Sequence, residues 1–406
     1  MQRVEAAINP ELMRWAREKS GYRNRIEDAA QKIGRTVEEL KAWESGKSKP
    51  TLAQVRKASE VYKRPLAVFF LPEPPKDFDT LRDFRRLPKD IPKEYSPNLA
   101  YIIRRIQNRQ RWLSEFLQSE GYPPLEFLYS PTTDNNPVSL ADKIRNFVGI
   151  TPKAVFQCRS REEALRLWID ETEHSGIYVC QAGNLKHERI DVEEARGATL
   201  ADKYAPFIFL NARDAKAAQL FTLAHELVHL WINEPGLSNL VAPRRPNTDT
   251  EKIEIFCNIV AAEILVPQVL FKSLMQTVRE YSIEEQIRNL SIKFKVSQEV
   301  IARRLLDFGN ITQKTYMQLA RKFRQELIEQ KEKEEQEIKT KKVIINYNLL
   351  KIINNGRTFT KTVINAYKNG EISGIVTANL LEMKLNKLPT VADMLHLPLT
   401  GRRTAT

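Results

Sequence analysis

The chain has 406 residues, of which 42% are hydrophobic and 28% charged, and its formal net charge is +13. These values are those of an ordinary soluble protein with two or three domains. The start MQRVEAAINP has no apolar leader and no stretch approaches 18 apolar residues, so we expect a cytoplasmic protein, neither secreted nor membrane-spanning. The positive charge suggests an acidic partner, with nucleic acid the first candidate, although scattered lysines more often serve solubility.

The chain has three cysteines, Cys158, Cys180 and Cys257, which lie far apart and form no C-x-x-C. This spacing argues against a disulfide framework or a cysteine zinc site, and it fits a reducing cytosol.

Residues 1–75 predict a helix-turn-helix domain of short helices. Asn9 and Pro10 are typical of a helix start, Gly34 ends a second helix, and Thr36 caps a third. The pattern resembles the Cro/C1 repressor type through Ala30, Gly34, Thr36, Leu40, Trp43, Glu44 and Gly46. The resemblance implies that the helix after Thr36 enters the major groove of DNA.

The third helix of this domain gives a mixed signal for DNA binding. Arg35, Lys41 and Lys47 are the candidate phosphate contacts. Glu38 and Glu39 open the same helix, and their carboxylates would face phosphates. DNA binding and docking to another protein are therefore both open interpretations of this domain.

Residues 76–136 predict a helical connector, entered through a proline-rich extended stretch. Residues 97–121 have apolar positions spaced for one buried side of a basic helix. We expect its arginines to form the solvated face or to contribute a basic surface. They are Arg104, Arg105, Arg109 and Arg111.

Residues 137–320 combine helical and strand patterns. Ser160 precedes a helix that runs to about Thr172, and residues 177–181 and 207–211 are rich in strand-forming side chains. With three or four strands available, we expect an α+β fold that is mostly helical, with a small sheet beside a buried helix.

That buried helix carries the motif with the strongest chemical meaning. His225-Glu226-Leu-Val-His229 lies in the apolar run FTLAHELVHLW. Residues four apart on a helix share one face, so both imidazoles can reach one metal ion, while Glu226 can act on a bound water as general base. Two neutral imidazoles, an adjacent base and an open position are what a zinc hydrolase needs.

A third ligand is expected from the next helix, over residues 251–265. Glu251, Glu254 and Asn258 share a face of this helix by the i, i+3, i+7 rule, whereas Glu263 points about 180° away. Glu254 is the first choice and Glu251 the alternative. The metzincin continuation is excluded, because it needs Gly and His where this chain has Ile232 and Pro235.

The two motifs together resemble the ImmA/IrrE metallopeptidases. The resemblance lies in FTLAHELVH and in Glu254, Asn258, Ala261, Ala262, Glu263, Leu265 and Pro267. It implies that His225, His229 and Glu254 hold Zn²⁺ and that Glu226 is the catalytic base. Cys257 stands where that family usually has alanine, and its similar size lets it pack there.

The strand over residues 207–211 is our candidate for substrate binding. In peptidases with this motif an edge strand commonly binds the substrate as an added strand, which would give this role to Phe207, Ile208, Phe209, Leu210 and Asn211. The alternative is an interior strand, because four apolar residues follow one another. No oxyanion helper is evident; His187 and Tyr204 are possible, although such residues are ordinarily structural.

The C-terminal third is helical. Residues 321–345 predict a charged linking helix, and residues 346–406 a small helical module whose task the sequence does not give. Ser297 caps another expected helix, on which Arg303 and Arg304 could meet nucleic acid or a partner.

The sequence chemistry indicates a zinc-dependent peptidase. Resemblance implies an endopeptidase whose substrate is a helix-turn-helix repressor controlling a mobile element or a stress response. The alternative is a DNA-binding regulator with a structural or inactive metal site.

Overall fold

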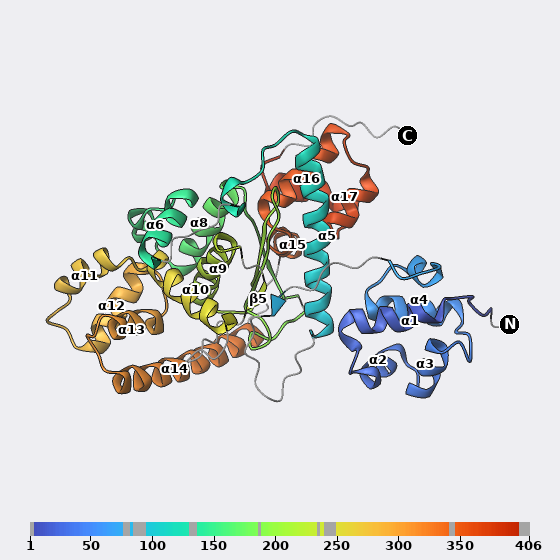
Figure 1. Cartoon of the computed structure of the whole chain (residues 1–406), viewed down its shortest axis with the longest axis horizontal. Coiled ribbons are helices and arrows are strands. Elements are labelled where there is room, and N and C mark those ends of the chain that lie inside the picture. The colour runs from blue at the N-terminus through green and yellow to red at the C-terminus, as the bar shows by residue number, and fades with distance from the viewer. Residues whose placement is uncertain are drawn as a thin grey trace. The chain divides into compact units, whose positions relative to one another are not determined.

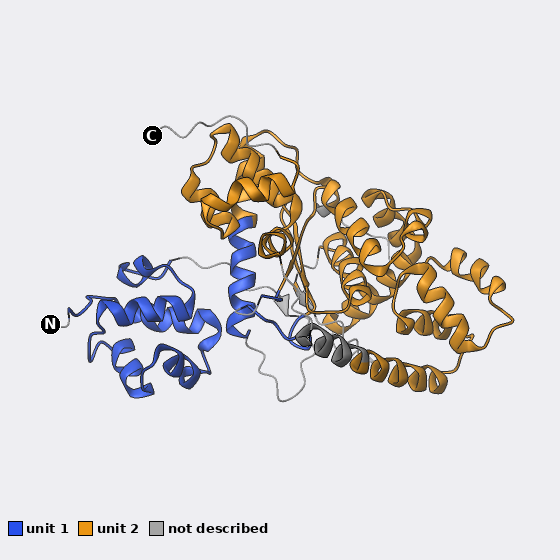
Figure 2. Ribbon diagram, turned by 180° about the vertical axis from the view of Figure 1, so that it is seen from behind, with its two compact units in different colours: residues 1–81, 87–109, 183–195 blue, residues 82–86, 110–182, 196–406 orange. Residues whose placement is uncertain are grey.

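The computed structural model describes residues 4–75, 82–83, 95–129, 136–185, 188–233, 236–238, 249–340 and 346–397. The chain forms two compact units, coloured separately in Figure 2. The first unit contains residues 1–81, 87–109 and 183–195, and the second contains residues 82–86, 110–182 and 196–406.

The first unit contains the predicted helix-turn-helix domain. Its elements are α1 (Pro10–Arg17), the π-turn η1 (Glu18–Tyr22), α2 (Ile26–Ile33), α3 (Val37–Glu44), α4 (Leu52–Tyr62) and the 3-10 turn η2 (Leu66–Phe70). Gly34 ends α2 at φ 76°, a left-handed conformation that glycine adopts at little cost. Thr36 and Glu39 then cap α3 reciprocally. Local sequence signals therefore fix the turn between α2 and α3.

The long helix α5 (Pro97–Ser119) contradicts one expectation. Arg105 and Arg109 are buried rather than solvated. In the first unit Arg105 Nη1 donates a hydrogen bond of 2.8 Å to Glu188 Oε2, so the guanidinium is neutralised inside the fold. The predicted solvated face was wrong for these two arginines, and for Arg105 the reason is a partner 83 positions away in the sequence.

The second unit contains a mixed sheet of five strands among the described residues, in the order β1-β5-β3-β4-β2. The strands are β1 (Arg82–Asp83), β2 (Tyr178–Ala182), β3 (Gly197–Leu200), β4 (Phe207–Asn211) and β5 (Gly236–Ser238). Strand β4 is parallel to β2 and antiparallel to β3, and β5 pairs antiparallel with Gly197 and Ala198 of β3. The sequence indicated three or four strands, and the very short β1 and β5 escaped notice.

Helices cover both faces of this sheet. Figure 1 shows α8 (Arg161–His174) and α9 (Lys216–Trp231) on one side and α15 (Tyr347–Asn355) and α16 (Arg357–Asn369) on the other. On the α9 side follow η3 (Glu126–Tyr129), α6 (Pro137–Val148), α7 (Pro152–Gln157) and α10 (Asp249–Leu265). One continuous apolar core joins α6, α8, α9 and α10, so α9 is enclosed by packed side chains.

The remaining elements form a helical lobe and a C-terminal module. They are α11 (Gln268–Thr277), α12 (Ile283–Phe294), α13 (Gln298–Asp307), α14 (Gln313–Thr340), α17 (Gly374–Leu381), η4 (Leu385–Lys387) and α18 (Leu388–Met394). The mostly helical α+β class is confirmed. Among the described residues no single helix could cross a membrane by length and hydropathy; only α10 and α11 together meet that test, and they are bent by 55°.

Candidate metal centre

Helix α9 places three polar side chains in the interior of the second unit. His225, Glu226 and His229 are at most 1% exposed, although their neighbours on the helix are almost all apolar. A helix that is hydrophobic on every side is buried, and its few polar side chains are buried with it. The Nε2 atoms of the two histidines lie 3.0 Å apart, so both imidazoles point at one place.

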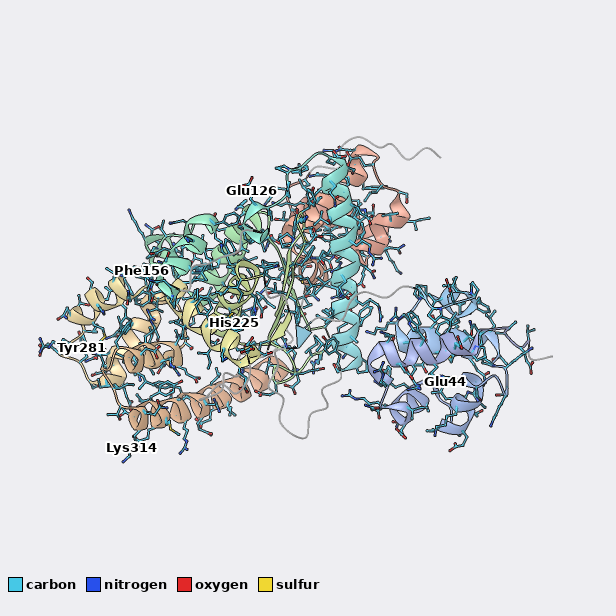
Figure 3. All side chains as sticks on the ribbon, in the orientation of Figure 1. Glu44, Glu126, Phe156, His225, Tyr281 and Lys314 are labelled. Carbon is cyan, nitrogen blue, oxygen red and sulfur yellow. The ribbon has the colours of Figure 1, made fainter. Side chains whose placement is uncertain are left out.

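Helix α10 packs against α9 and contributes the third side chain. Glu254 Oε1 lies 3.1 Å from His229 Nε2, and Glu254 Oε2 lies 3.5 Å from His225 Nε2. Among the described residues these three form the cluster able to hold a metal ion, and Glu251 is not part of it. Figure 3 marks His225 at this position in the second unit.

The cluster attracts positive charge. Burial by itself lowers the pKa of His225, but the facing Glu254 carboxylate outweighs burial and raises this pKa above its usual range. Burial by itself raises the pKa of Glu254, but the two imidazoles outweigh it and hold the pKa at about 2. A charged carboxylate buried between two imidazoles is the electrostatic condition for binding a cation.

The ligand spacing fits a tetrahedral zinc ion. Bonds of about 2.1 Å at tetrahedral angles place neighbouring ligand atoms about 3.4 Å apart. Here the two Nε2 atoms lie 3.0 Å apart, and the Glu254 oxygens Oε1 and Oε2 lie 3.1 Å from His229 Nε2 and 3.5 Å from His225 Nε2, respectively. Two imidazole nitrogens and one carboxylate oxygen are also the donor set of open catalytic zinc sites.

Asn258 orients one of the ligands from one helical turn beyond Glu254. Its Oδ1 lies 3.1 Å from His225 Nδ1, so Nδ1 carries the hydrogen and donates it. The lone pair is then on Nε2, which faces the cluster. The sequence placed Asn258 on the correct face of α10 but gave it no role.

Glu226 faces strand β3, and its charge acts on the neighbouring His225. Thr199 Oγ1 lies 2.6 Å from Glu226 Oε2 and 3.1 Å from the main-chain oxygen of Glu226. A Cβ atom on Gly197 would lie 2.7 Å from Glu226 Oε1, so only glycine allows this approach of strand to helix. Sequence reasoning missed Thr199, because nothing local distinguishes it from other strand threonines.

The predicted substrate-edge strand is wrong. Strand β4, with Phe207, Ile208, Phe209, Leu210 and Asn211, lies between β2 and β3 and is buried throughout. Both of its edges are therefore paired, and it cannot accept an added strand. The alternative of an interior strand, indicated by its uninterrupted apolar run, was the correct one.

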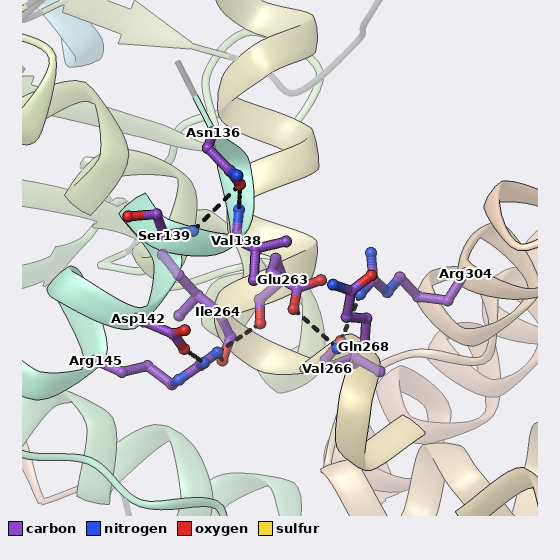
Figure 4. A network of polar contacts seen from close by, with 10 residues as sticks. All are labelled: Asn136, Val138, Ser139, Asp142, Arg145, Glu263, Ile264, Val266, Gln268 and Arg304. Atoms are coloured by element: carbon purple, nitrogen blue, oxygen red, sulfur yellow. Dashed lines mark hydrogen bonds and ion pairs between the residues drawn. The ribbon is translucent and has the colours of Figure 1, made fainter. Parts of the chain in front are cut away.

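The far end of α10 is fixed by a polar network, drawn in Figure 4. The buried Glu263 carboxylate pairs with Arg304 of α13 and accepts a hydrogen bond of 2.8 Å from the Gln268 N–H. Arg145 of α6 donates to the main-chain oxygen of Glu263 at 2.7 Å. Arg304 is buried, so the suggestion that it meets nucleic acid was wrong.

The candidate DNA-contacting side chains of the first unit lie on its surface. Lys41 and Lys47 are exposed, and Arg35, just before α3, lies 3.6 Å from Glu39 of that helix in an ion pair. Glu38 is exposed on the same helix. The local charge of this helix is therefore balanced rather than strongly basic.

The two candidates for an oxyanion helper gain no role. His187 lies outside the described residues. Tyr204 is half-buried in the loop between β3 and β4, where its N–H donates to Asp202 Oδ1 at 2.9 Å.

Comparison with known families agrees with this geometry. Residues 172–306 match the model of the M78 peptidases, described as an IrrE N-terminal-like domain. These residues form an IrrE-like domain. It contains α9, α10 and strands β2 to β5, and residues 13–69 match a helix-turn-helix model. No curated protein matches the chain.

The resemblance expected from the two sequence motifs is thereby confirmed. The chain has a helix-turn-helix domain followed by a domain similar to the IrrE-like peptidases, an arrangement that supports a protease plus regulator architecture. The family is typically metal-dependent, in agreement with the cluster of His225, His229 and Glu254.

Proposed function

We propose that the chain is a zinc-dependent endopeptidase that cuts a protein regulator. The convergence of His225, His229 and Glu254, with Glu226 beside them on α9, carries this proposal. A structural zinc site is closed by four protein ligands and needs no base. Here three ligands meet, and a carboxylate that is not one of them lies next to the cluster.

Each side chain has a distinct task in peptide hydrolysis. A zinc ion bound by His225, His229 and Glu254 supplies Lewis-acid chemistry and makes a water molecule acidic enough to react near neutral pH. Glu226 accepts the proton of the attacking water and returns it to the nitrogen of the departing amine. Asn258 keeps His225 in the tautomer that offers Nε2.

The substrate is proposed to lie along strand β3. This strand contacts α9 directly at Glu226, through Gly197 and Thr199, and among the described residues it pairs with β5 only at Gly197 and Ala198, whereas β4 is paired along both sides. An extended peptide added beside β3 would present its carbonyl groups next to the base. Strand β5 already pairs antiparallel with Gly197 and Ala198, so an incoming peptide must share or displace that edge.

The proposed substrate is a helix-turn-helix repressor. Support for it comes from the resemblance to ImmA/IrrE proteins and from the helix-turn-helix domain within this chain, which gives the peptidase a means of reaching a regulator or its DNA. The rival function is a DNA-binding regulator whose metal site is structural.

Coexpression with candidate helix-turn-helix repressors tests the proposal. Intact-mass analysis is expected to show two complementary repressor fragments with the unaltered chain and none with Glu226→Gln. Because Glu226 is not a ligand, the variant should still bind one zinc ion per chain. Equal cleavage by a zinc-loaded Glu226→Gln protein would overturn the enzyme assignment. DNA binding without any fragments would favour the rival.

A further inference from the structure

Thr199 is a fully buried side chain of β3 whose hydroxyl faces the catalytic helix. Its Oγ1 lies 2.6 Å from Glu226 Oε2 and belongs to a different element from every metal ligand. We propose that Thr199 is a positioning residue that holds the Glu226 carboxylate in the orientation required of a base. This inference rests on the proposed function, in which Glu226 exchanges a proton with water and amine.

Burial makes this contact important to Glu226. The side chain of Glu226 is 0% exposed, and a buried carboxylate without hydrogen-bond donors is strongly disfavoured. The Thr199 hydroxyl supplies one donor at a distance typical of a strong O–H···O⁻ bond. A fixed donor on one oxygen also restricts rotation of the carboxylate about its terminal bond.

The hydroxyl is itself held by rigid main chain. Residues 197–200 of β3 pair with β4, with Thr199 opposite Ile208. The neighbouring Gly197 and Ala198 pair with β5 on the other side. Thr199 therefore acts from a strand fixed in the sheet, which gives greater positional accuracy than a loop would.

Gly197 and Thr199 act on the two carboxylate oxygens separately. They are two residues apart, so they share one face of the strand. Thr199 contacts Oε2, and Gly197 leaves room for Oε1, which would lie 2.7 Å from a Cβ atom at position 197. Thr199 of the strand thus holds Oε2 of Glu226 by a hydrogen bond, and Gly197 leaves space for Oε1.

The hydroxyl also has a second acceptor within reach. Thr199 Oγ1 lies 3.1 Å from the main-chain oxygen of Glu226, but its single hydrogen can serve only one acceptor at a time. When Glu226 has taken a proton, the hydroxyl can accept from the carboxyl group and donate to the main-chain oxygen. Glu226 therefore keeps a partner at both stages of its cycle.

Infrared spectroscopy of the zinc-loaded full-length chain tests the contact without a substrate. Subtracting the spectrum of the matching Glu226→Gln protein isolates the Glu226 carboxylate band. Thr199→Val removes the hydroxyl at nearly constant volume and is expected to shift this band, whereas Thr199→Ser keeps it near the original position. A band unchanged by Thr199→Val would refute the contact.

Cleavage of the purified repressor that is cut in the coexpression experiment tests the consequence for catalysis. Thr199→Val is expected to lower kcat about 10- to 100-fold, as removal of supporting hydrogen bonds around a metal site does, with little change in KM. Thr199→Ser should recover most of the loss, and zinc content should stay at one per chain. Equal losses for the serine and valine variants, or a loss that follows zinc content, would overturn the positioning role.

Thr172 supplies the matched control. It is a buried threonine of α8 whose hydroxyl has no hydrogen-bond partner among the described residues, so Thr172→Val is expected to leave kcat unchanged. If Glu226→Gln also cuts at the original rate, the proposed function has failed. If Thr199→Val cuts at the original rate and Glu226→Gln does not, the positioning role alone has failed.

Discussion

Two buried glutamates, one in the helix-turn-helix domain and one in the metal centre, have opposite surroundings. Glu44 of α3 receives hydrogen bonds of 2.7 and 2.9 Å from the Nε and Nη2 atoms of Arg17, a cation that is permanently present. Glu254 of α10 faces two imidazoles, which carry a full charge only when protonated. The charge of Glu44 is balanced by Arg17 within the chain, whereas the charge of Glu254 is available to a cation from outside.

This difference separates the structural carboxylates from the metal-ligand carboxylate in this molecule. Glu188 with Arg105 and Glu263 with Arg304 belong with Glu44, since each buried carboxylate meets a guanidinium. A buried ion pair of this kind fixes the packing of two elements but leaves no charge to attract a ligand. Within the part of the chain that the structure describes, only Glu254 combines burial with partners that are also candidate metal ligands.

The largest expected effect is loss of zinc through Glu254→Gln. An amide oxygen is a weaker ligand and removes the negative charge from the cluster, so zinc affinity should fall by more than the roughly 10- to 100-fold typical of losing an outer partner. Competition with a zinc chelator measures this, and peptidase activity should fall with it. Glu251→Gln, on the same helix but outside the cluster, should retain the original affinity. Equal affinities for both variants would remove Glu254 from the ligand set.

The opposite prediction applies to the helix-turn-helix domain. Breaking the Arg17–Glu44 ion pair should lower the stability of this domain and leave the zinc affinity of the chain unchanged. Arg17→Met leaves the Glu44 carboxylate buried without its guanidinium, and such a loss costs about 3–5 kcal/mol. Hydrogen exchange of peptides within residues 10–62 of the full chain should accelerate accordingly. The double variant Arg17→Met with Glu44→Leu should recover much of the protection from hydrogen exchange, because no buried charge is then left without a partner. A double variant as unprotected as Arg17→Met would contradict this account.

The sequence was sufficient for those parts of the site that depend on local periodicity. The four-residue spacing of His225 and His229 and the i, i+3, i+7 face of Glu254 follow from helix geometry alone. The same holds for the turn at Gly34 and the cap at Thr36, which are set by residues a few positions apart. Wherever the determining contact was local, the predicted feature agrees with the structure.

The failures all involve partners distant in sequence. The burial of Arg105 depends on Glu188, and that of Arg304 on Glu263. The apolar run of β4 left the interior place open as an alternative, but the choice between edge and interior depends on the order of strands, which is set by pairings distant in the chain. Thr199 contacts Glu226 across 27 positions, and a single strand threonine carries no sign of such a contact.

Glu173 extends the comparison to a buried carboxylate with neither a guanidinium nor an imidazole. Its oxygens accept hydrogen bonds from the Val179 and Thr358 N–H groups and from the Thr358 hydroxyl. Burial outweighs these donors and raises the pKa of Glu173 from 4.5 to about 7. The unfolded chain therefore releases this proton at lower pH than the folded chain does.

The resulting pH dependence has a definite sign. The contribution of Glu173 to the free energy of unfolding is greatest below its unfolded pKa of 4.5. This contribution declines by up to about 3 kcal/mol as pH rises to about 7, and it does not change further above that. Hydrogen exchange of residues 356–369, corrected for its intrinsic pH dependence, should show this decline between pH 5 and pH 8. Glu173→Gln should flatten it, whereas Glu171→Gln on the same helix should not. A slope unchanged by Glu173→Gln would contradict the prediction.

A smaller effect is expected from Asn258, which orients a ligand without binding metal. Asn258→Ala removes the acceptor 3.1 Å from His225 Nδ1, so the imidazole can rotate and change tautomer. Zinc affinity should fall about 10- to 100-fold, less than for Glu254→Gln. Asn258→Asp restores an acceptor and should recover affinity, as the same chelator competition would show. An alanine variant with the original affinity would show that packing alone orients the imidazole.

The smallest effect is expected on α3, where the side chains are exposed and no buried charge is at stake. If this helix contacts DNA, Lys41→Ala should weaken binding to duplex DNA modestly and reduce the slope of log affinity against log salt by about 1, as loss of one phosphate contact does. Lys57→Ala, on α4 beside Glu60, is the control and should leave the slope unchanged. Removing the adjacent carboxylate in Glu38→Gln should strengthen binding, because that group faces the same phosphates. A chain whose DNA binding does not depend on salt, or is equally affected by both lysines, would assign α3 to docking with a protein instead.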